Sequence, residues 1–461
     1  MKYLLQHIKK HTLFLLFLTV LLEIGNYTFG QAAGDYRSFV TGNWNAAGTW
    51  QTYNGSAWVA AGSPPTSANG VITILNGHTV TVSANVTVDQ VIIDAGGQAT
   101  VNAGITLTIA NGAGTDMTVN GTLVNSGSLT TTGTLAFNSG SSYQHARDGG
   151  TIPVATWNSA STCNITGITG TEVTTNLNQT FGNFTWNCPA QTVNPNTLNG
   201  MNGITIAGNF NLISTGTGSI RLGSGTSRSF TISGNFNISG GTYNLSSGNG
   251  TGTIYINGNF NMSGGTITET SGGNGAFVFN GTINQDFIKT GGTILNNINF
   301  TINSGAILNM GTYVLDGSTG TFNLNSGGGV ITANTGGLTS SGATGSIQVG
   351  GTRTYSTGAN YTYNGTAAQV TGNGLTGANN LIINNTAGAT LTGNTTISGT
   401  LTLTAGAFTI GANTLTLNGP TIAGTPSNLT TSSSSSLVFG GTSAGVLIPS
   451  SVTALNGLSV T

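Results

Sequence analysis

The tripeptide Gly-Asn-Phe recurs through the middle of the chain at nearly constant intervals. Copies begin at Gly182, Gly208, Gly234 and Gly258, and a degenerate copy, Gly-Thr-Ile, begins at Gly281. The steps between them are nearly equal, at about 23–26 residues each. Similar apolar stretches precede three of the copies, at Ile204–Ala207, Phe230–Ser233 and Ile254–Asn257. Because whole strands recur, the pattern predicts a solenoid of stacked repeats rather than a sandwich of hairpins.

Apolar and polar residues alternate over short stretches along most of the chain, as in Thr79–Val82 and Ile105–Ile109. Such alternation buries one face of a strand, and Asn-Gly pairs such as Asn76-Gly77 suit the bends between strands. A period of about 25 residues fits a coil of three short strands and three bends. The sequence therefore predicts an all-β fold, a parallel β-helix (β-solenoid). Roughly 16 coils would fill residues 65–461, giving a rod on the order of 75 Å long.

Identical residues on successive coils stack into ladders when the coils share one register. We expect an internal stack of phenylalanines and an amide ladder at a bend, formed by Phe184, Phe210, Phe236 and Phe260 and by Asn183, Asn209, Asn235 and Asn259. A row of exposed, ligand-binding aromatic rings is the alternative.

Two regions depart from this rhythm. Three similar tripeptides begin at Gly121, Gly127 and Gly133, six residues apart. This spacing predicts a tighter coil of about 18 residues and a range of coil lengths of about 18–26. Residues 31–64 are rich in aromatic side chains, and we expect them to form an N-terminal cap over the first coil. Four of these aromatics offer a competing role in stacking on sugars, namely Trp44, Trp50, Tyr53 and Trp58.

The two ends of the chain carry further expectations. Lys2, Lys9 and Lys10 precede an apolar run from Thr12 to Leu22, so residues 1–30 are predicted to be an export signal that is cleaved. The run is shorter than the ~20 residues of a spanning helix, which disfavours a membrane anchor. We therefore expect a secreted or cell-surface protein with no membrane span after signal removal. The last residues resemble the middle of a strand, and a longer parent chain is expected.

Charge is scarce, because only 4% of the 461 residues are charged while 74 are glycine. Without residues 1–30 the chain keeps six basic and nine acidic residues, a net charge of −3. Nucleic-acid binding requires clustered Lys and Arg and is therefore not expected. Frequent β-branched residues argue for a folded chain rather than a disordered one.

The two cysteines, Cys163 and Cys188, are separated by about 25 residues, the expected length of one coil. Equivalent positions on adjacent coils and an oxidising compartment favour a disulfide between them. Two buried free thiols are the alternative. A metal site is not expected here, because no His or acidic cluster accompanies the pair.

Ionisable residues offer little for catalysis. Asp89 and Asp94 have an odd offset and are expected on opposite faces. The densest group is His145, Arg147 and Asp148, which we interpret as a solvated loop with a local ion pair, and Asp286 with Lys289 is interpreted as a second pair. A calcium solenoid needs Asp at the end of a Gly-Gly-x-Gly-x-Asp word, where this chain has Phe277. No catalytic residue, metal or cofactor is therefore assigned.

From about Tyr143 onward the chain resembles a family of large exported β-helix proteins from bacteria with a type IX secretion system. The similarity lies in Thr156–Gly167, Phe181–Thr192, Gly345–Gln348, Arg353–Tyr355 and Tyr361–Gly365. Residues 44–110 loosely resemble the extracellular module named for its eight glycines, through Trp44, Trp50, Pro65, Val71–Ile74, Gly77–Val80 and Gly96-Gly97. The resemblance implies an exported β-helix and further C-terminal repeats with a sorting domain, but no catalytic residues.

The sequence thus predicts a non-enzymatic, adhesin-like protein whose coils act as a stiff spacer or as a polar surface for polysaccharides or cell-surface glycans. The alternative is a polysaccharide-active β-helix enzyme, a lyase or glycoside hydrolase. That alternative requires a cleft with at least two convergent acids or an Asp-Arg-Lys group.

Overall fold

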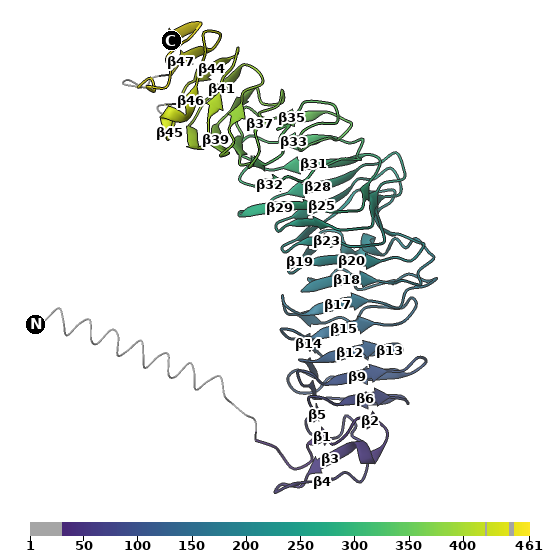
Figure 1. The fold of residues 1–461 in the computed structure, drawn as a ribbon. Coiled ribbons are helices and arrows are strands. Elements are labelled where there is room, and N and C mark those ends of the chain that lie inside the picture. Colours follow the sequence, from purple (N-terminus) through teal and green to yellow (C-terminus); the bar gives the residue numbers. More distant parts are fainter. Residues whose placement is uncertain (1–29, 420–421, 442–446) are drawn as a thin grey trace, which may run out of the picture.

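The computed structural model describes residues 30–419, 422–441 and 447–461, and these form an elongated, curved rod of stacked β-coils (Figure 1). Helix is confined, among these residues, to three short 3-10 turns, η1 (Ala47–Thr49), η2 (Thr197–Met201) and η3 (Pro426–Asn428). Nearly all strand pairs are parallel and join successive coils. The predicted parallel β-helix is therefore confirmed.

Each coil has three sides, and the first side forms one ladder along most of the rod. Its seventeen described strands are β2 (Gly42–Asn43), β6 (Thr79–Val82), β9 (Gln98–Val101), β12 (Thr122–Asn125), β15 (Ser142–His145), β17 (Thr162–Ile165), β18 (Asn183–Asn187), β20 (Phe210–Ser214), β23 (Phe236–Ile238), β26 (Phe260–Met262), β29 (Asn284–Lys289), β32 (Ile307–Gly311), β34 (Gly329–Thr332), β36 (Asn360–Tyr363), β39 (Asn380–Asn384), β42 (Leu401–Ala405) and β45 (Ile422–Gly424).

The second side is interrupted and consists of three separate sheets. The first contains β7 (Val86–Val88), β10 (Thr106–Ile109) and β13 (Ser128–Thr131); the next contains β21 (Ile220–Gly223), β24 (Thr242–Ser246), β27 (Thr266–Thr268) and β30 (Thr293–Ile294); the last contains β37 (Gln369–Val370), β40 (Ala389–Thr390), β43 (Phe408–Thr409) and β46 (Leu429–Thr430).

The third side also has three sheets. They contain β1 (Tyr36–Ser38), β5 (Ile72–Ile74), β8 (Val91–Ile93), β11 (Met117–Val119), β14 (Leu135–Phe137) and β16 (Thr156–Trp157); then β19 (Thr205–Ile206), β22 (Arg228–Ile232), β25 (Gly252–Ile256), β28 (Gly275–Phe279), β31 (Ile298–Ile302), β33 (Phe322–Leu324) and β35 (Arg353–Tyr355); then β38 (Gly377–Ala378), β41 (Thr395–Ile397), β44 (Thr414–Leu417), β47 (Ser436–Phe439) and β48 (Gly457–Val460).

The predicted phenylalanine stack is present in the core. Phe210 pairs with Phe184 and Phe236 in register, and the three rings stack with centroids 5.9 and 5.7 Å apart. Phe236 stacks on Phe260 at 5.4 Å, and all four side chains are fully buried. Offset-stacked rings add to the stabilisation from burial alone. The alternative of an exposed aromatic row is wrong.

The predicted amide ladder exists in a modified form. The Oδ1 of Asn209 accepts the backbone N–H of Asn235 at 2.8 Å, and Asn183 and Asn235 make the same bond to the next coil. Each bend is therefore fixed by a side chain of the coil before it. The glycine before each asparagine is required by close stacking, since a Cβ at Gly258 would overlap the carbonyl oxygen of Gly234.

Coil length follows the sequence pattern with two exceptions. Met117 lies opposite Leu135, which confirms the predicted tighter coil. The degenerate copy at Gly281 was placed wrongly, because Phe260 pairs with Phe287 one coil later, and Ile283 is 73% exposed. The second exception is the coil from Gly329 to Asn360, which is longer than the predicted range.

Residues 31–64 close the end of the rod and also supply its first coil. Strands β1 and β2 pair in parallel with β5 and β6, whereas β3 (Trp50–Tyr53) and β4 (Trp58–Ala60) add antiparallel strands beside β1. Trp44 and Trp50 fill the end of the core, with ring centroids 4.9 Å apart. An antiparallel hairpin of this kind shields the edge of a parallel stack.

The export signal predicted over residues 1–30 falls, except for Gly30, outside the described residues. Within the described ranges no helix is both long and apolar enough to cross a membrane.

Candidate functional site

The aromatic residues proposed for sugar stacking divide into two pairs. Trp44 and Trp50 are buried, and their indole N–H groups donate to the carbonyls of Pro65 and Trp44, at 2.9 and 2.8 Å. Stacking on a sugar is therefore wrong for these two residues. Tyr53 and Trp58 remain partly exposed with ring centroids 5.3 Å apart, and the Arg37 guanidinium lies 4.5 Å from the Trp58 ring centroid.

The predicted disulfide is absent. Cys163 lies opposite Phe184, whereas Cys188 lies four residues further along and its thiol contacts the carbonyl of Ile165 at 3.4 Å. Both side chains are buried free thiols. Burial raises the pKa of Cys163 strongly and that of Cys188 to about 11, so both remain protonated and unreactive near neutral pH. The disulfide prediction failed because the coil that begins at Cys163 ends at Phe184. This coil is shorter than the sequence separation of the two cysteines.

The group His145, Arg147 and Asp148 is not a solvated ion pair. His145 is fully buried between the Tyr143 hydroxyl, 3.1 Å from Nδ1, and the Gly149 carbonyl, 2.7 Å from Nε2. Burial, with a smaller contribution from the charge on Arg147, lowers the pKa of His145 to about 4. The imidazole is therefore neutral near pH 7 and serves as a structural hydrogen-bonding group.

Asp148 and Arg147 each bind a neighbouring coil instead of one another. Oδ1 of Asp148 accepts the backbone N–H groups of Thr169, Gly170 and Thr171 at 2.8 to 3.0 Å. Partial burial raises the pKa of Asp148, but these hydrogen bonds outweigh it and hold the pKa at about 2. The Arg147 guanidinium donates to the Gly127 carbonyl and to the Ser128 hydroxyl.

The second predicted pair, Asp286 with Lys289, is also wrong. Lys289 forms an ion pair with Asp316 at 2.8 Å, one coil later, while Asp286 accepts a hydrogen bond from the Asn309 amide at 2.8 Å. The offset of three residues along β29 directs the two side chains to opposite faces.

Two acids missed as a pair, Asp89 and Asp116, come close together across one coil. Burial and the proximity of Asp116 raise the pKa of Asp89. Asp116 is fully buried, yet N–H donors from Thr134 and Gly112 lower its pKa. Because Asp116 is buried and saturated by the chain's own donors, the pair does not provide an exposed acid and nucleophile.

A polar pocket lies where the second side is interrupted. Between β13 and β21 no regular strand occupies that side in the described residues. The segments there are joined by one isolated parallel bridge, Thr151 with Thr175, and by scattered backbone hydrogen bonds, such as that from Thr192 N–H to the Thr169 carbonyl at 2.9 Å. The opening between residues 172–178 and the turn at 196–200 is a pocket of about 420 Å³. Its size is within the ~300–1,000 Å³ range typical of small-ligand sites.

Side-chain hydrogen bonds hold the walls of this pocket. Asn176 has a left-handed backbone, φ 66°, and its amide donates to the Ile152 carbonyl at 2.9 Å. Gln179 donates to Pro153 and accepts from the backbone N–H of Ala155, at 3.0 and 2.9 Å. The opposite wall is the turn η2, which lies close over Leu177.

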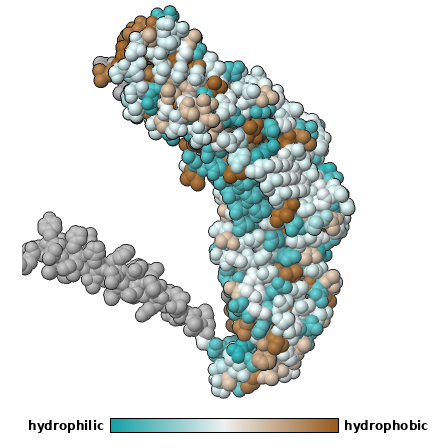
Figure 2. Space-filling model, viewed as in Figure 1, coloured by the Kyte–Doolittle hydropathy of each residue, from teal (hydrophilic) through white to brown (hydrophobic). Residues whose placement is uncertain are grey.

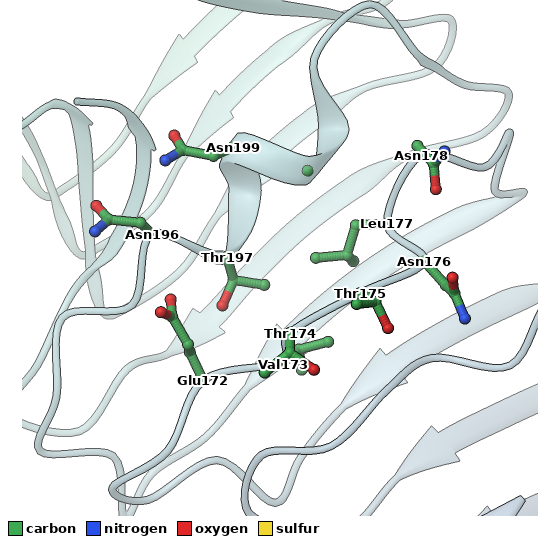
Figure 3. A pocket seen from close by; sticks show the side chains of 11 residues that line it. Glu172, Val173, Thr174, Thr175, Asn176, Leu177, Asn178, Asn196, Thr197 and Asn199 are labelled. Carbon is green, nitrogen blue, oxygen red and sulfur yellow. The ribbon is translucent and has the colours of Figure 1, made fainter. Parts of the chain in front are cut away.

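Polar atoms line the pocket with little charge among them. Glu172 and Thr197 face one another across it, Asn196 and Asn199 flank them, and Leu177 forms an apolar wall (Figure 3). The hydroxyl of Thr197 and Oδ1 of Asn199 are buried and make no hydrogen bond to the described chain. Both atoms lie beneath the accessible surface, so they do not project into the pocket.

A second pocket, a groove of about 430 Å³, runs across the outer face of the first side, from β29 to β42. Its floor includes Ile307, Ile331 and Ile382 with Thr362 and Thr402, and these strands lie on the inner side of the rod's curve (Figure 1). None of its described lining residues carries a buried unpaired polar atom. The lining of this groove is more apolar than that of the first pocket.

The sequence patterns did not predict this pocket. The one available signal is an interruption of the strand pattern. Over residues 168–202 the period-two alternation lapses, while asparagine and threonine accumulate. No family model, curated protein or solved structure matches this chain. The geometry described above is therefore the basis for any functional proposal.

Proposed function

We propose that the protein is a secreted or cell-surface rod that acts as a stiff spacer and presents a polar, non-enzymatic binding surface to glycans. The observation that carries the proposal is the first side of the rod, where seventeen strands form one ladder with polar side chains along much of its outer face. Predicted export and the resemblance to exported β-helix proteins support the location.

Stiffness follows from bonding between successive coils, which is continuous along the first side. Backbone hydrogen bonds join each coil to the next, and side chains at the bends add contacts such as Asn209 to Asn235. Repeats that contact only their neighbours resist bending in proportion to these interfaces. A continuous stack of this length suits a spacer better than a hinge.

The outer face suits glycans because it is rich in amides and poor in charge. Asn237 accepts from Asn261 and donates to Asn211, both at 2.8 Å, and Asn211 donates to Thr185. Figure 2 shows a hydrophilic stretch on the shaft at the level of these strands. Amides and hydroxyls donate and accept hydrogen bonds, as sugar hydroxyls also require.

A glycan array tests the binding half of the proposal, and small-angle X-ray scattering of the same sample tests the rod. We expect weak binding to glycans, an elongated particle in solution, and no release of reducing ends or unsaturated uronides from the bound polysaccharides. Catalytic release of sugar would overturn the non-enzymatic assignment. A compact particle would overturn the spacer, and an array without binding would overturn the glycan surface.

A further inference from the structure

The outer face of the first side changes its chemistry along the rod. The amide row that contains Asn237 and Asn261 ends at Ile288, which lies opposite Asn261 on the next coil. From β34 to β42 the outward residues that lie opposite one another in register are Ile331, Thr362, Ile382 and Thr402. Isoleucine and threonine therefore alternate on successive coils along the floor of the groove between β29 and β42.

This alternation has a fixed length. Successive coils advance by about 4.8 Å, so the same kind of side chain recurs about every 9.6 Å along the floor. A linear polymer matches such a row if each unit advances by about one coil and if identical groups face the same way on every second unit. Extended β-1,4-linked glycans have both properties, because successive sugars are rotated by half a turn. Helical glucans turn their faces away from a straight row.

A row of amides flanks this floor, and the chain itself holds it in place. The Asn380 amide donates to Asn360 Oδ1 at 2.8 Å, and Asn380 Oδ1 accepts the Thr400 backbone N–H at 2.9 Å. Amides fixed in this way need little further ordering when a ligand binds. The four residues of the floor are themselves partly exposed, so a ligand in the groove can touch them.

We propose that this groove binds one chain of a neutral, extended β-1,4-linked glycan that lies along the axis of the rod. Ile331 and Ile382 contact the C–H groups of alternate sugars. Thr362 and Thr402 exchange hydrogen bonds with the hydroxyls of the sugars between them. The proposal rests on the glycan-binding function above and names both the class of glycan and the part of the surface that binds it.

The charges near the groove favour a neutral glycan over an acidic one. None of the described residues that line the groove is ionisable. At one end, on β29, Asp286 accepts a hydrogen bond from the Asn309 amide, so the one charge on this part of the face is negative. An acidic sugar would lose hydration there without gaining a cation as a partner.

An extended peptide is the main competitor, because it also repeats after two units. Peptides of this kind gain affinity by pairing with the free edge of a sheet. Each strand beneath the groove already has a neighbour on both sides in the ladder, so no edge is available there. A glycan needs only side-chain contacts, which are the contacts that this face offers.

Titration calorimetry on the full chain tests the site, with cellohexaose and chitohexaose as ligands and with maltohexaose, laminarihexaose and glucose as comparisons. We expect at least one of the two β-1,4-linked hexasaccharides to bind, and the comparison sugars to bind at least about tenfold more weakly. Ile382→Ser should weaken binding about tenfold through lost apolar contact, and Thr362→Val about fivefold through a lost hydrogen bond. The matched control Thr416→Val removes an outward hydroxyl from β44, on the third side, and should leave binding unchanged.

The inference is overturned if neither β-1,4-linked hexasaccharide binds, if a helical glucan binds equally well, or if Thr362→Val and Thr416→Val bind alike. Sedimentation of the unliganded protein examines self-association, and a dimer that Ile382→Ser dissociates would assign the groove to a second copy of the chain instead. If binding on the glycan array persists at full strength in Ile382→Ser, the groove is wrong while the glycan-binding surface stands. An array without any binding would remove both.

Discussion

The coils from β19 to β31 and the coils immediately before them are held together in different ways. In the former, all three sides carry parallel strands, and pairs such as Tyr243 with Ile267 continue the ladder on the second side. In the latter, residues 147–204, the second side relies on one isolated bridge, on scattered backbone hydrogen bonds and on the side chains of Asp148, Asn176 and Gln179.

The difference between these two regions shows where a rod of this kind contains a pocket. A backbone ladder pairs its own donors and acceptors and brings neighbouring coils together at the strand spacing, about 4.8 Å. Where side chains replace the ladder, they join residues 148–155 to residues 169–179, and the pocket lies on the far side of the second segment, between residues 172–178 and the turn η2. Regular pairing stabilises the rod, and the pocket lies where that pairing is interrupted.

The largest expected effect is in the regular coils. Phe236→Ala removes a buried ring stacked between Phe210 and Phe260, so we expect the free energy of unfolding to fall by about 3–5 kcal/mol. Denaturant unfolding measures the loss. Asn237→Ser, on the outward neighbour, should cost less than about 1 kcal/mol. Equal losses in the two variants would show that the stack does not dominate the stability of these coils.

The second prediction concerns the irregular coils. Gln179→Ala removes hydrogen bonds to Pro153, Ala155 and the Trp157 indole, so we expect a loss of about 2 kcal/mol. Hydrogen exchange should accelerate at Ala155 and remain unchanged in β25. The matched control is Gln144→Ala, whose side chain makes one outward bond to Thr166, at 3.2 Å. If Gln144→Ala accelerates exchange at Ala155 equally, the side chain of Gln179 does not specifically hold this segment in place.

The sequence was sufficient for the regular coils because each carries its own evidence. Phe210 and Phe236 repeat at the coil step, and an equal step places them in register. The same reasoning failed at Gly281, because the triplet Gly-Thr-Ile resembles Gly-Asn-Phe but its isoleucine does not continue the buried stack. Phe287, the residue that continues the stack, lies six residues later in a different local context.

The pocket was beyond such reasoning because its walls depend on pairs separated by about one irregular coil. Asp148 binds the N–H groups near Thr169, and Gln179 binds Ala155, yet no repeated word aligns either pair. The two acids Asp89 and Asp116 were missed for the same reason. No repeated word aligns β8 with β11, and only the observed register of these strands brings the acids that precede them together.

A smaller effect should test whether the charge of Asp148 contributes to the side-chain hydrogen bonds that join these coils. Asp148→Asn keeps an oxygen acceptor for the N–H groups of Thr169 and Thr171 but removes its charge, so we expect a loss of about 1 kcal/mol at pH 7. The lowered pKa of Asp148, about 2, means that its stabilisation is present above the unfolded value and is lost as pH falls through about 2. Unfolding curves of the two proteins should therefore converge at acid pH. A constant difference from pH 7 to pH 2 would exclude the charge as its cause.

The smallest effect is a gain in stability and concerns Asp89. This residue lies in the regular N-terminal coils, where the backbone ladder is intact. Burial and the contact with Asp116 raise the pKa of Asp89, so its stabilising state is the protonated one, present below the unfolded pKa and lost as pH rises through the folded value. Asp89→Asn fixes a neutral side chain there, and we expect a gain of less than about 1 kcal/mol at pH 7 that disappears toward acid pH. Asp94→Asn, on an acid with no contact to Asp116 in the structure, is the control. Thermal unfolding at several pH values separates the two, and a loss of stability in Asp89→Asn at pH 7 would mean that the charged pair supports the coil instead of straining it.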